Sequence, residues 1–362
     1  MKKKNKLKIA QIAPLWFPIP PKKYGGTEKI ISLLSDGLVE KGHQVSLFAS
    51  GDSKTKANLI AITKRNLINR NVPWSDWWWN NLNYSMAFEK AKDFDIIHSH
   101  WTPLGMYFQR FVKTPVLHTF HNLPKNSDIR WDILKRYKNS NIVYISQKEK
   151  NNSSINFRKE WVCYNGIDIS KFKFNKKPKN HFIWIGRICK DKGIENVIKI
   201  AKKAKIKLLL AGQLQPSYKD YFNKEIKPHL NSQIQYIGEL DQKQLSDFYG
   251  SAVAFLYPLE WQEPFGLCIV ESQACGTPVI AFNRGSVPEV IKNGKTGFVV
   301  PFLNEKKKIN IQGFVETVKK IDKIKREDCR KWVEENFRDK TMVNNYEEIY
   351  YKIINKKYEQ KT

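Results

Sequence analysis

Short apolar runs alternate with longer segments of helical periodicity along most of this chain. In its first half, apolar runs predict strands at 8–13, 44–48, 96–98, 116–118 and 142–145, and the periodicity predicts a helix over 27–40. In its second half they predict strands at 182–185, 207–211, 234–236, 253–257 and 278–281, separated by helices at 193–204, 242–250 and 266–274. Strand–helix–strand alternation of this kind is typical of parallel, doubly wound sheets.

A polar segment broken by a proline, at 175–180, separates the two halves and is predicted to be a linker. With 362 residues, the chain is long enough for two domains that each bury a core. We therefore expect an α/β protein with two facing Rossmann-like domains, over 1–175 and 180–337. Ligands of such sheets bind beyond the carboxyl ends of the strands, which predicts a site in a cleft between the domains. Residues 338–357 predict one further helix, with an apolar face that consists of Tyr346, Ile349, Tyr350 and Ile353.

The charge of the chain is strongly positive: 63 Lys and Arg stand against 35 Asp and Glu, a formal net charge of +28. Such an excess attracts polyanions. A solvated, lysine-rich surface is the plainer interpretation, and peripheral association with the anionic inner face of a membrane is the alternative. Because the chain shows no zinc finger and no RNA-binding aromatic motif, we expect no nucleic-acid partner.

The cysteines and the apolar runs predict a cytoplasmic protein. Five scattered cysteines without a C-x-x-C pair fit reduced thiols. No apolar run approaches the roughly 18–20 residues of a membrane-spanning helix. The basic start of the chain is followed by an apolar stretch at 7–15 that is too short for a signal peptide, and we expect it to be the first strand.

The most informative segment runs from Tyr257 to Pro278 and contains two glutamates at a strand-to-helix turn. Glu263 precedes a predicted helix, and Glu271 lies one to two turns inside it. Carboxylates accept hydrogen bonds from vicinal hydroxyls, and the free N–H groups at a helix start can also contact a ligand. One glutamate is therefore suited to sugar hydroxyls and the other to a ribose. The plainer alternative is a pair of surface glutamates, one of which interacts with the helix dipole.

Two basic residues follow the first strand of the second half. Arg187 and Lys192 lie in the loop between a predicted buried strand that ends near Gly186 and the next helix. Arg offers a bidentate fork and Lys a point charge, and both neutralise a diphosphate at a helix start. Solvated charges in a basic protein are the alternative.

A glycine pair and four histidines are the candidates of the first half. Gly25 and Gly26 let a backbone approach a phosphate closely, and Thr27 after them is the predicted N-cap of the first helix. The histidines lie at the ends of two apolar strands, at His98, His100, His118 and His121. No carboxylate or cysteine completes a metal-ligand set with them, so we expect no metal. The triplet Asp93-Phe94-Asp95 precedes its strand, at the wrong end of the sheet for a ligand.

Four tryptophans lie close together in the first half, at Trp74 and at three consecutive positions, Trp77, Trp78 and Trp79. They are suited to stacking on the sugar rings of an acceptor or to a membrane interface, and core packing is the alternative. Three consecutive side chains cannot all face one side of a helix, so at least one is exposed or covers another element.

The E-x₇-E spacing from Glu263 to Glu271, with the flanking E-P-F-G and A-C-G-T-P residues, resembles the donor-binding segment of family-4 glycosyltransferases. The resemblance spans nearly the whole chain. It implies a GT-B fold with an acceptor domain at 1–175, completed by the C-terminal helix at about 338–362, and a donor domain at 180–337. In that family the second glutamate binds the ribose of the nucleotide, and the first glutamate and the backbone after it contact the donor sugar.

The resemblance assigns roles to individual residues of this chain. It implies ribose binding by Glu271 and donor-sugar contacts by Glu263, Phe265, Gly266 and Leu267. It implies diphosphate binding by Arg187 and Lys192, a phosphate-loop role for Gly25 and above all Gly26, and a donor-sugar contact for His121. The residues expected to act in catalysis are Glu263, His121, Arg187 and Lys192.

The resemblance also implies an activity. We expect a metal-independent, retaining transfer of a hexose-type sugar from a nucleotide-diphosphate donor, with uridine as the expected base, to a glycan, lipid-linked or small-molecule acceptor. The departing phosphate itself is then suited to take the acceptor proton, and no cofactor is needed. The P-P-x-x-Y-G-G-T-E and A-S-G-D-S stretches resemble a bacterial subgroup linked to small-molecule and surface-glycan glycosylation. The alternatives are a GT-B-fold phosphorylase and a GT-B-fold protein that binds membranes or nucleic acid without catalysis.

Overall fold

The computed structural model of the chain describes residues 5–23, 25–101, 103–124 and 128–359, so Tyr24 beside the glycine pair lies outside the described residues. The chain divides into two compact units, one formed by the residues up to Gly166 together with those from Asp339 onward, and one formed by Ile167–Arg338. The boundary lies ahead of the predicted linker at 175–180 because that segment packs within the second unit. The N–H of Asn175 donates to the carbonyl of Cys275 at 3.1 Å, and Arg326 Nε donates to the carbonyl of Asn175 at 2.6 Å.

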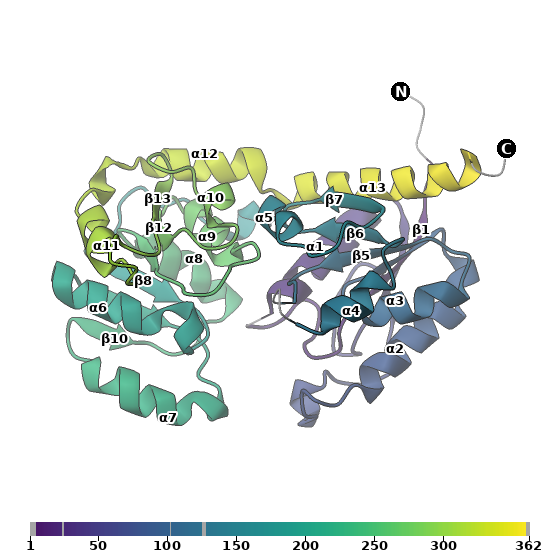
Figure 1. The fold of residues 1–362 in the computed structure, drawn as a ribbon, viewed down its shortest axis with the longest axis horizontal. Coiled ribbons are helices and arrows are strands. Elements are labelled where there is room, and N and C mark those ends of the chain that lie inside the picture. Colours follow the sequence, from purple (N-terminus) through teal and green to yellow (C-terminus); the bar gives the residue numbers. More distant parts are fainter. Residues whose placement is uncertain (1–4, 24, 102, 125–127, 360–362) are drawn as a thin grey trace. The chain divides into compact units, whose positions relative to one another are not determined.

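The first unit contains a seven-stranded parallel sheet with the order β3-β2-β1-β4-β5-β6-β7 (Figure 1). Its strands are β1 (Lys8–Ile12), β2 (Gln44–Phe48), β3 (Asn58–Ile60), β4 (Ile96–Ser99), β5 (Val116–Phe120), β6 (Asn141–Tyr144) and β7 (Lys159–Val162). Its helices are α1 (Gly26–Glu40), α2 (Trp78–Glu89), α3 (Leu104–Phe108), α4 (Arg130–Lys135), α5 (Gln147–Asn151) and α13 (Asp339–Glu359). Helix α1 packs against α13, and α2 packs against α3.

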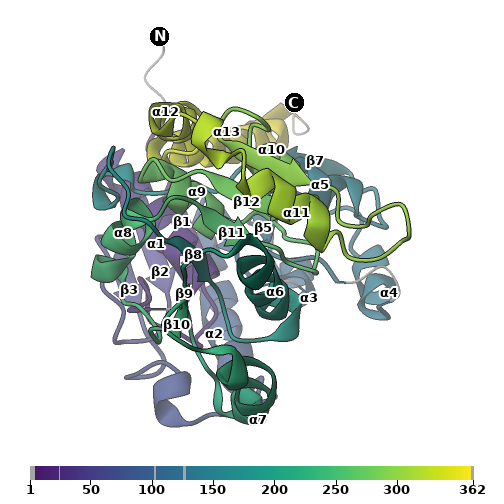
Figure 2. The same cartoon turned by 90° about the vertical axis from the view of Figure 1, so that its left-hand side faces the viewer.

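The second unit contains a six-stranded parallel sheet with the order β10-β9-β8-β11-β12-β13. Its strands are β8 (Phe182–Ile185), β9 (Leu208–Ala211), β10 (Ile234–Tyr236), β11 (Phe255–Tyr257), β12 (Val279–Phe282) and β13 (Gly297–Val300). Its helices are α6 (Ile194–Ala204), α7 (Lys219–Tyr221), α8 (Gln242–Ser251), α9 (Leu267–Ala274), α10 (Val287–Val290), α11 (Ile311–Val318) and α12 (Arg326–Asn336). Helices α6 and α11 pack together, and α9 packs against α8 and α12 (Figure 2).

The strands and helices predicted from periodicity are confirmed to within two residues at almost every end. The predicted N-cap at Thr27 is wrong, because α1 begins one residue earlier with Gly25 as its N-cap. The strands β3, β7 and β13 were not predicted. All three are edge strands whose residues are mostly half-buried, which weakens the apolar signal on which the prediction depends.

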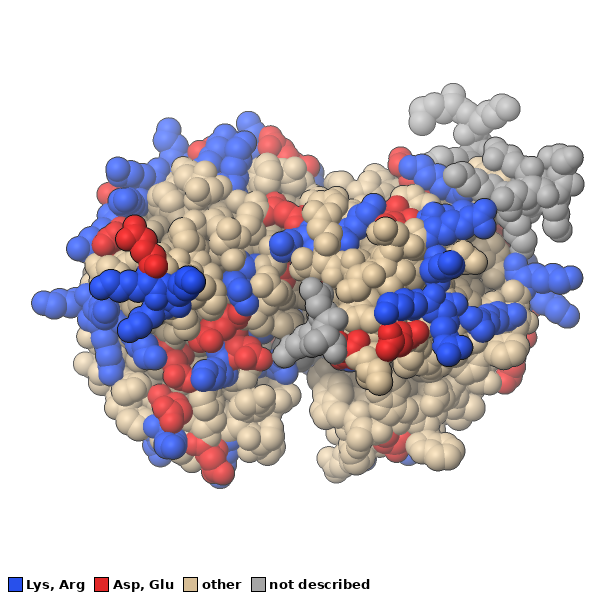
Figure 3. Space-filling view, in the orientation of Figure 1, with Lys and Arg blue, Asp and Glu red and all other residues tan. Residues whose placement is uncertain are grey.

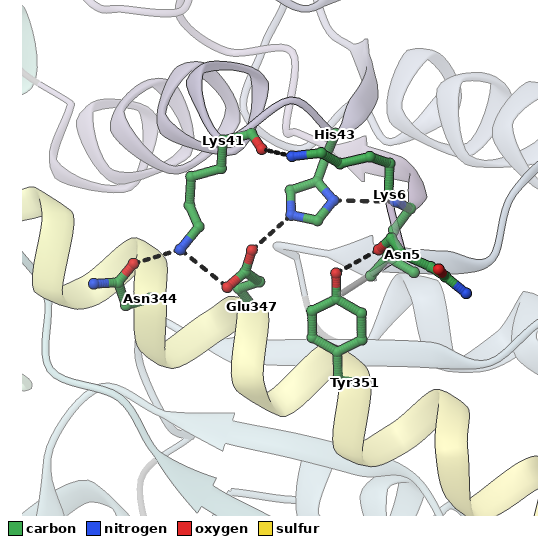
Figure 4. A network of polar contacts seen from close by, with 8 residues as sticks. Asn5, Lys6, Lys41, His43, Asn344, Glu347 and Tyr351 are labelled. Carbon is green, nitrogen blue, oxygen red and sulfur yellow. Dashed lines mark hydrogen bonds and ion pairs between the residues drawn. The ribbon is translucent and has the colours of Figure 1, made fainter. Parts of the chain in front are cut away.

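The C-terminal helix α13 is held to the first unit by an apolar face and a polar clamp. Tyr346, Ile349, Tyr350 and Ile353 are all buried, which confirms the predicted face. The clamp centres on Glu347, whose carboxylate pairs with Lys41 Nζ at 2.9 Å and with His43 Nε2 at 2.9 Å (Figure 4). His43 Nδ1 accepts a hydrogen bond from the N–H of Leu7 at 3.1 Å, so Nε2 carries the proton that is donated to Glu347. None of the helices in the described part of the chain combines the length and apolar character that crossing a membrane requires.

Candidate active site

The strand order of the second unit places one pair of loops where such sheets bind ligands. Strands β8 and β11 are neighbours in the sheet although they are not consecutive in the chain, so the direction of winding reverses between them. Ligands of doubly wound sheets bind beyond the carboxyl ends of the strands at this switch point. The loop after β8 carries Arg187 and Lys192, and the loop after β11 carries Glu263.

Glycine at position 193 lets these two loops pack directly against each other. Gly193 has a φ of +74°, and a Cβ there would lie 2.0 Å from the carbonyl oxygen of Pro258. The contact is extended by the N–H of Glu260, which donates to the carbonyl of Asp191 at 3.0 Å. Lys192 and Glu263 are thereby brought together from sequence positions far apart.

Three donors converge on a single oxygen of Glu263. Its Oε2 accepts from Tyr257 OH at 2.7 Å, from Trp261 Nε1 at 2.9 Å and from Lys192 Nζ at 3.0 Å. The structure assigns Oε1 no hydrogen bond among the described residues. One carboxylate oxygen is thus saturated by the protein, and the other is available to accept from a ligand hydroxyl.

The electrostatics of this cluster keep the glutamate ionised. Burial alone would raise the pKa of Glu263, but the Lys192 ammonium and the hydrogen bonds from Tyr257, Lys192 and Trp261 outweigh it and lower the pKa below its usual value. Lys192 Nζ also lies 4.1 Å from the ring centroid of Trp261, a cation–π contact. An ionised carboxylate and an ammonium are therefore held side by side, with side-chain exposures of only 10% and 14%.

The segment Arg284-Gly285-Ser286 fixes the position of the Glu263 loop by contacts to its backbone, a role that the sequence did not reveal. The N–H and Oγ of Ser286 both donate to the carbonyl of Glu263, at 2.8 and 3.0 Å. A Cβ at Gly285 would lie 2.1 Å from that same oxygen, and Arg284 Nε donates to the carbonyl of Glu260 at 2.9 Å. This segment is a positioning element for Glu263.

The remaining predicted donor-binding residues follow Glu263 into helix α9. Gly266 caps the helix with a φ of +87°, Leu267 is its first residue and Phe265 is buried against Phe337. Glu271 is the fifth residue of the helix and is buried, and its Oε2 accepts from Tyr249 OH at 3.0 Å. The two glutamates therefore sit before and inside one helix start, as the pattern predicted.

The other predicted residues belong to the first unit. Gly25 has a φ of +140°, and a Cβ there would meet Pro21 at 2.8 Å and a carboxylate oxygen of Glu28 at 2.9 Å. Burial raises the pKa of Glu28, in the first turn of helix α1, to about 7. Gly26 begins helix α1.

A chain of hydrogen bonds leads from the partly buried His121 into the core of the first unit. His121 Nε2 contacts His100 Nδ1 at 3.1 Å, and His100 Nε2 contacts Gln11 Oε1 at 2.7 Å. Gln11 Nε2 donates to Tyr350 OH at 2.9 Å, and this hydroxyl contacts His98 Nδ1 at 2.8 Å. The chain ties the predicted sugar contact to helix α13.

The direction of these hydrogen bonds sets the protonation of His121. Because His100 Nε2 donates to a carbonyl oxygen, its Nδ1 accepts, and His121 must donate from Nε2. Desolvation by burial lowers the pKa of His121 to about 4, so its ring is neutral near pH 7 and its Nδ1 carries a lone pair. His118 is buried in β5, and its Nε2 contacts Gln109 Oε1 at 3.1 Å.

Within the described residues, no group of three or more His, Cys, Asp or Glu side chains is placed to hold a metal ion. Asp95 lies at the amino end of β4, and its Oδ2 accepts from the N–H of Lys8 at 2.8 Å. Sequence reasoning missed Tyr257 and Trp261, although both lie in the Y-P-L-E-W-Q-E stretch before Glu263. It also missed Gln11 and Tyr350, which no local motif marks.

Two Rossmann-like units with parallel sheets of seven and six strands are the architecture of the GT-B class of glycosyltransferases. Comparison with known proteins agrees: residues 24–171 match "Glycosyltransferase Family 4", and residues 167–338 match "Glycosyl transferases group 1". The chain belongs to this family of glycosyltransferases.

Several relatives and solved structures are similar to the chain. An uncharacterized 41.2 kDa protein in the cps region of Klebsiella pneumoniae is 30% identical over 300 residues, which cover 72% of this chain and 80% of the relative. The capsular polysaccharide biosynthesis glycosyltransferase CapM of Staphylococcus aureus is 29% identical over 51% of this chain and 52% of its own. In fold, a sucrose-phosphate synthase from Thermosynechococcus elongatus matches with a TM-score of 0.78 at 19% identity, over 96% of this chain and 99% of that one. Anabaena HepE, solved with UDP and glucose, matches with a TM-score of 0.73 at 16% identity, over 95% and 99%.

Proposed function

We propose that this glycosyltransferase moves a hexose-type sugar from a UDP-sugar to a glycan acceptor, with retention of anomeric configuration and without a metal ion. The observation that carries the proposal is the Glu263 cluster at the switch point of the second unit. A cation for the diphosphate and an acceptor oxygen for a sugar hydroxyl lie side by side there. The structure of HepE with UDP and glucose supports a UDP-sugar as the donor. The similarity to CapM, a glycosyltransferase of capsular polysaccharide biosynthesis, supports a glycan as the acceptor.

The chemistry of the transfer follows from these groups. The acceptor hydroxyl oxygen bonds to the anomeric carbon on the face that the leaving group vacates, and the bond from that carbon to the β-phosphate oxygen breaks. The acceptor proton passes to the departing phosphate, so UDP leaves with the bonding electron pair and one proton more. Arg187 and Lys192 stabilise the charge that grows on the diphosphate, which is the task a metal ion performs in other enzymes. Glu271 is assigned to the ribose hydroxyls.

In the proposed reaction Glu263 holds the donor sugar and does not act as a base. A lowered pKa makes it a poor proton acceptor at neutral pH, while its Oε1 remains a good hydrogen-bond acceptor. His121 is neutral and presents a lone pair, which suits it to accept from a sugar hydroxyl. A carboxylate near the sugar also stabilises the positive charge of an oxocarbenium-like transition state.

UDP release from a set of UDP-hexoses, with and without EDTA, tests this function. We expect turnover of at least one donor that EDTA leaves unchanged, and an NMR spectrum of the product with the anomeric configuration of the donor. Glu271→Ala should weaken UDP binding at least tenfold, whereas Glu305→Gln, at an exposed glutamate in the same unit, should behave as wild type. Loss of turnover in EDTA, inversion at the anomeric carbon or a requirement for inorganic phosphate would each overturn the proposal.

A further inference from the structure

The first unit carries a connected group of four tryptophans at its own switch point, two of which are largely exposed. In its sheet the winding reverses between β1 and β4, so the loops that follow these two strands flank the position where a ligand binds. Trp16 lies in the loop after β1, and Trp101 lies just beyond β4. Their ring centroids are 6.4 Å apart.

Two further rings extend this pair towards solvent. Trp74 lies against Trp16 with ring centroids 4.5 Å apart, and Trp77 stacks on Trp101 at 4.8 Å with an interplanar angle of 22°. Trp74 is 53% exposed and Trp77 is 45% exposed. We call Trp16, Trp74, Trp77 and Trp101 the tryptophan platform. The platform therefore exposes large apolar rings to solvent, and the fold holds these rings in fixed positions. Exposed apolar patches of this kind are typical of binding surfaces.

The charge around the platform distinguishes between two possible ligands, an anionic membrane surface and a neutral sugar ring. Residues 71–89, which carry Trp74 and Trp77, contain neither Lys nor Arg, although 63 of the 362 residues of the chain are basic, and they include Asp76 and Glu89. The nearest cation before them, Arg70, lies over the ring of Trp79 at 4.3 Å, a tryptophan outside the platform. On the face drawn in Figure 3, the lower part of the surface over α2 shows almost no Lys or Arg. An anionic membrane would attract a basic surface. A neutral pyranose needs no charge, because its C–H face stacks on an aromatic ring.

We infer that the tryptophan platform binds an uncharged pyranose ring of the acceptor glycan. This inference rests on the proposed function only where it identifies the bound sugar as part of the acceptor. The binding of a pyranose ring to the platform does not depend on that function. Trp74 and Trp77 present their exposed surfaces to the sugar, and Trp16 and Trp101 fix the orientation of those two rings from beneath. The platform therefore selects acceptors by ring shape and neutrality.

Ligand-observed NMR titration of the full chain tests the platform without knowledge of the acceptor. The probes are the methyl α- and β-glycosides of glucose, galactose and N-acetylglucosamine. At least one should bind, and Trp74→Ala and Trp77→Ala should each weaken its binding by about tenfold, since lost stacking and burial of an aromatic ring are worth roughly 1–2 kcal/mol. Trp77→Phe should keep most of the affinity. Trp161→Phe, at a partly exposed tryptophan in β7, should leave it unchanged.

UDP binding to the same variants separates the two proposals. Trp74→Ala and Trp77→Ala should bind UDP as wild type does, which also shows that they are folded. A wild-type chain that binds a glycoside but not UDP would refute the proposed function and leave the platform standing. If none of the glycosides binds, or if the alanine variants bind them unchanged, the inference is overturned. It is also overturned if wild type binds phosphatidylglycerol vesicles and the alanine variants do not, because the platform would then be a membrane anchor.

Discussion

Replacement of Glu263 by glutamine should destabilise the second unit by about 2 kcal/mol and abolish donor turnover. Unit charges 3.0 Å apart attract each other by roughly 5 kcal/mol at an effective dielectric constant of about 20. Part of this is offset, because the glutamine variant no longer desolvates a carboxylate and keeps an oxygen for the three donors. What remains is a nearly buried Lys192 ammonium without its counter-charge.

Scanning calorimetry and UDP release together measure the two effects. A loss of about 2 kcal/mol in a domain of this size lowers the Tm by about 4–8 °C. Lys192→Met should also destabilise, because it leaves Glu263 buried without a cation. In the double variant, Lys192→Met with Glu263→Gln, the two losses should partly cancel, with a coupling energy of about 1–2 kcal/mol. All three variants should lack donor turnover, because the recovered stability does not restore the charges.

The stability of the double variant tests whether Lys192 and Glu263 are energetically coupled. If its loss of stability equals the sum of the two single losses, the carboxylate and the ammonium are not coupled as the structure shows. If Glu263→Gln melts at the wild-type temperature, the pair contributes nothing to the fold. Glu305→Gln is the matched control and should leave both the Tm and UDP release unchanged.

Two further predictions concern pH and backbone strain. Burial depresses the pKa values of His98 and His100 and lowers those of His118 and His121 to about 3 and about 4, so the folded state excludes protons that the unfolded chain takes up. Stability is then fully present above the unfolded value near 6.5 and falls as the pH drops towards 4, and a chemical-denaturation series should show this decline; a flat profile would contradict it. Glu28, whose pKa is raised to about 7, acts in the opposite direction between pH 4.5 and 7, but one carboxyl does not outweigh four imidazoles. Gly285→Ala should reduce UDP-sugar turnover more than UDP affinity, since its Cβ displaces the backbone of Glu263 and not Glu271; equal losses of both would contradict the positioning role.

Much of the fold was predictable because parallel strands buried on both faces are nearly continuous apolar runs. β8, with Phe-Ile-Trp-Ile, is such a run, and its bounds were predicted without error. The edge strand β3 has no fully buried residue, so it leaves no such signal. The two compact units meet between Gly166 and Ile167, ahead of the polar segment at 175–180. Asn175 in that segment hydrogen-bonds within the second unit through its backbone, a contact that composition does not show.

The candidate site was predictable only where a motif lies within one loop. Glu263 and Glu271 stand out because eight positions separate them across a single strand-to-helix turn. Lys192 was expected to face a diphosphate, and the structure adds that it pairs with Glu263, a contact made by two loops about 70 positions apart. The chain of hydrogen bonds from His121 to Tyr350 joins residues more than 200 positions apart in the sequence, and no local pattern could reveal it.

In the proposed reaction, the cations and glutamates of the second unit bind the UDP-sugar without a metal ion. Isothermal titration of the full chain with UDP in the presence of EDTA measures this directly. We expect saturable binding that Arg187→Ala and Glu271→Ala each weaken at least tenfold and that Glu305→Gln leaves unchanged. Binding that requires a divalent cation, or that survives both substitutions undiminished, would contradict the account.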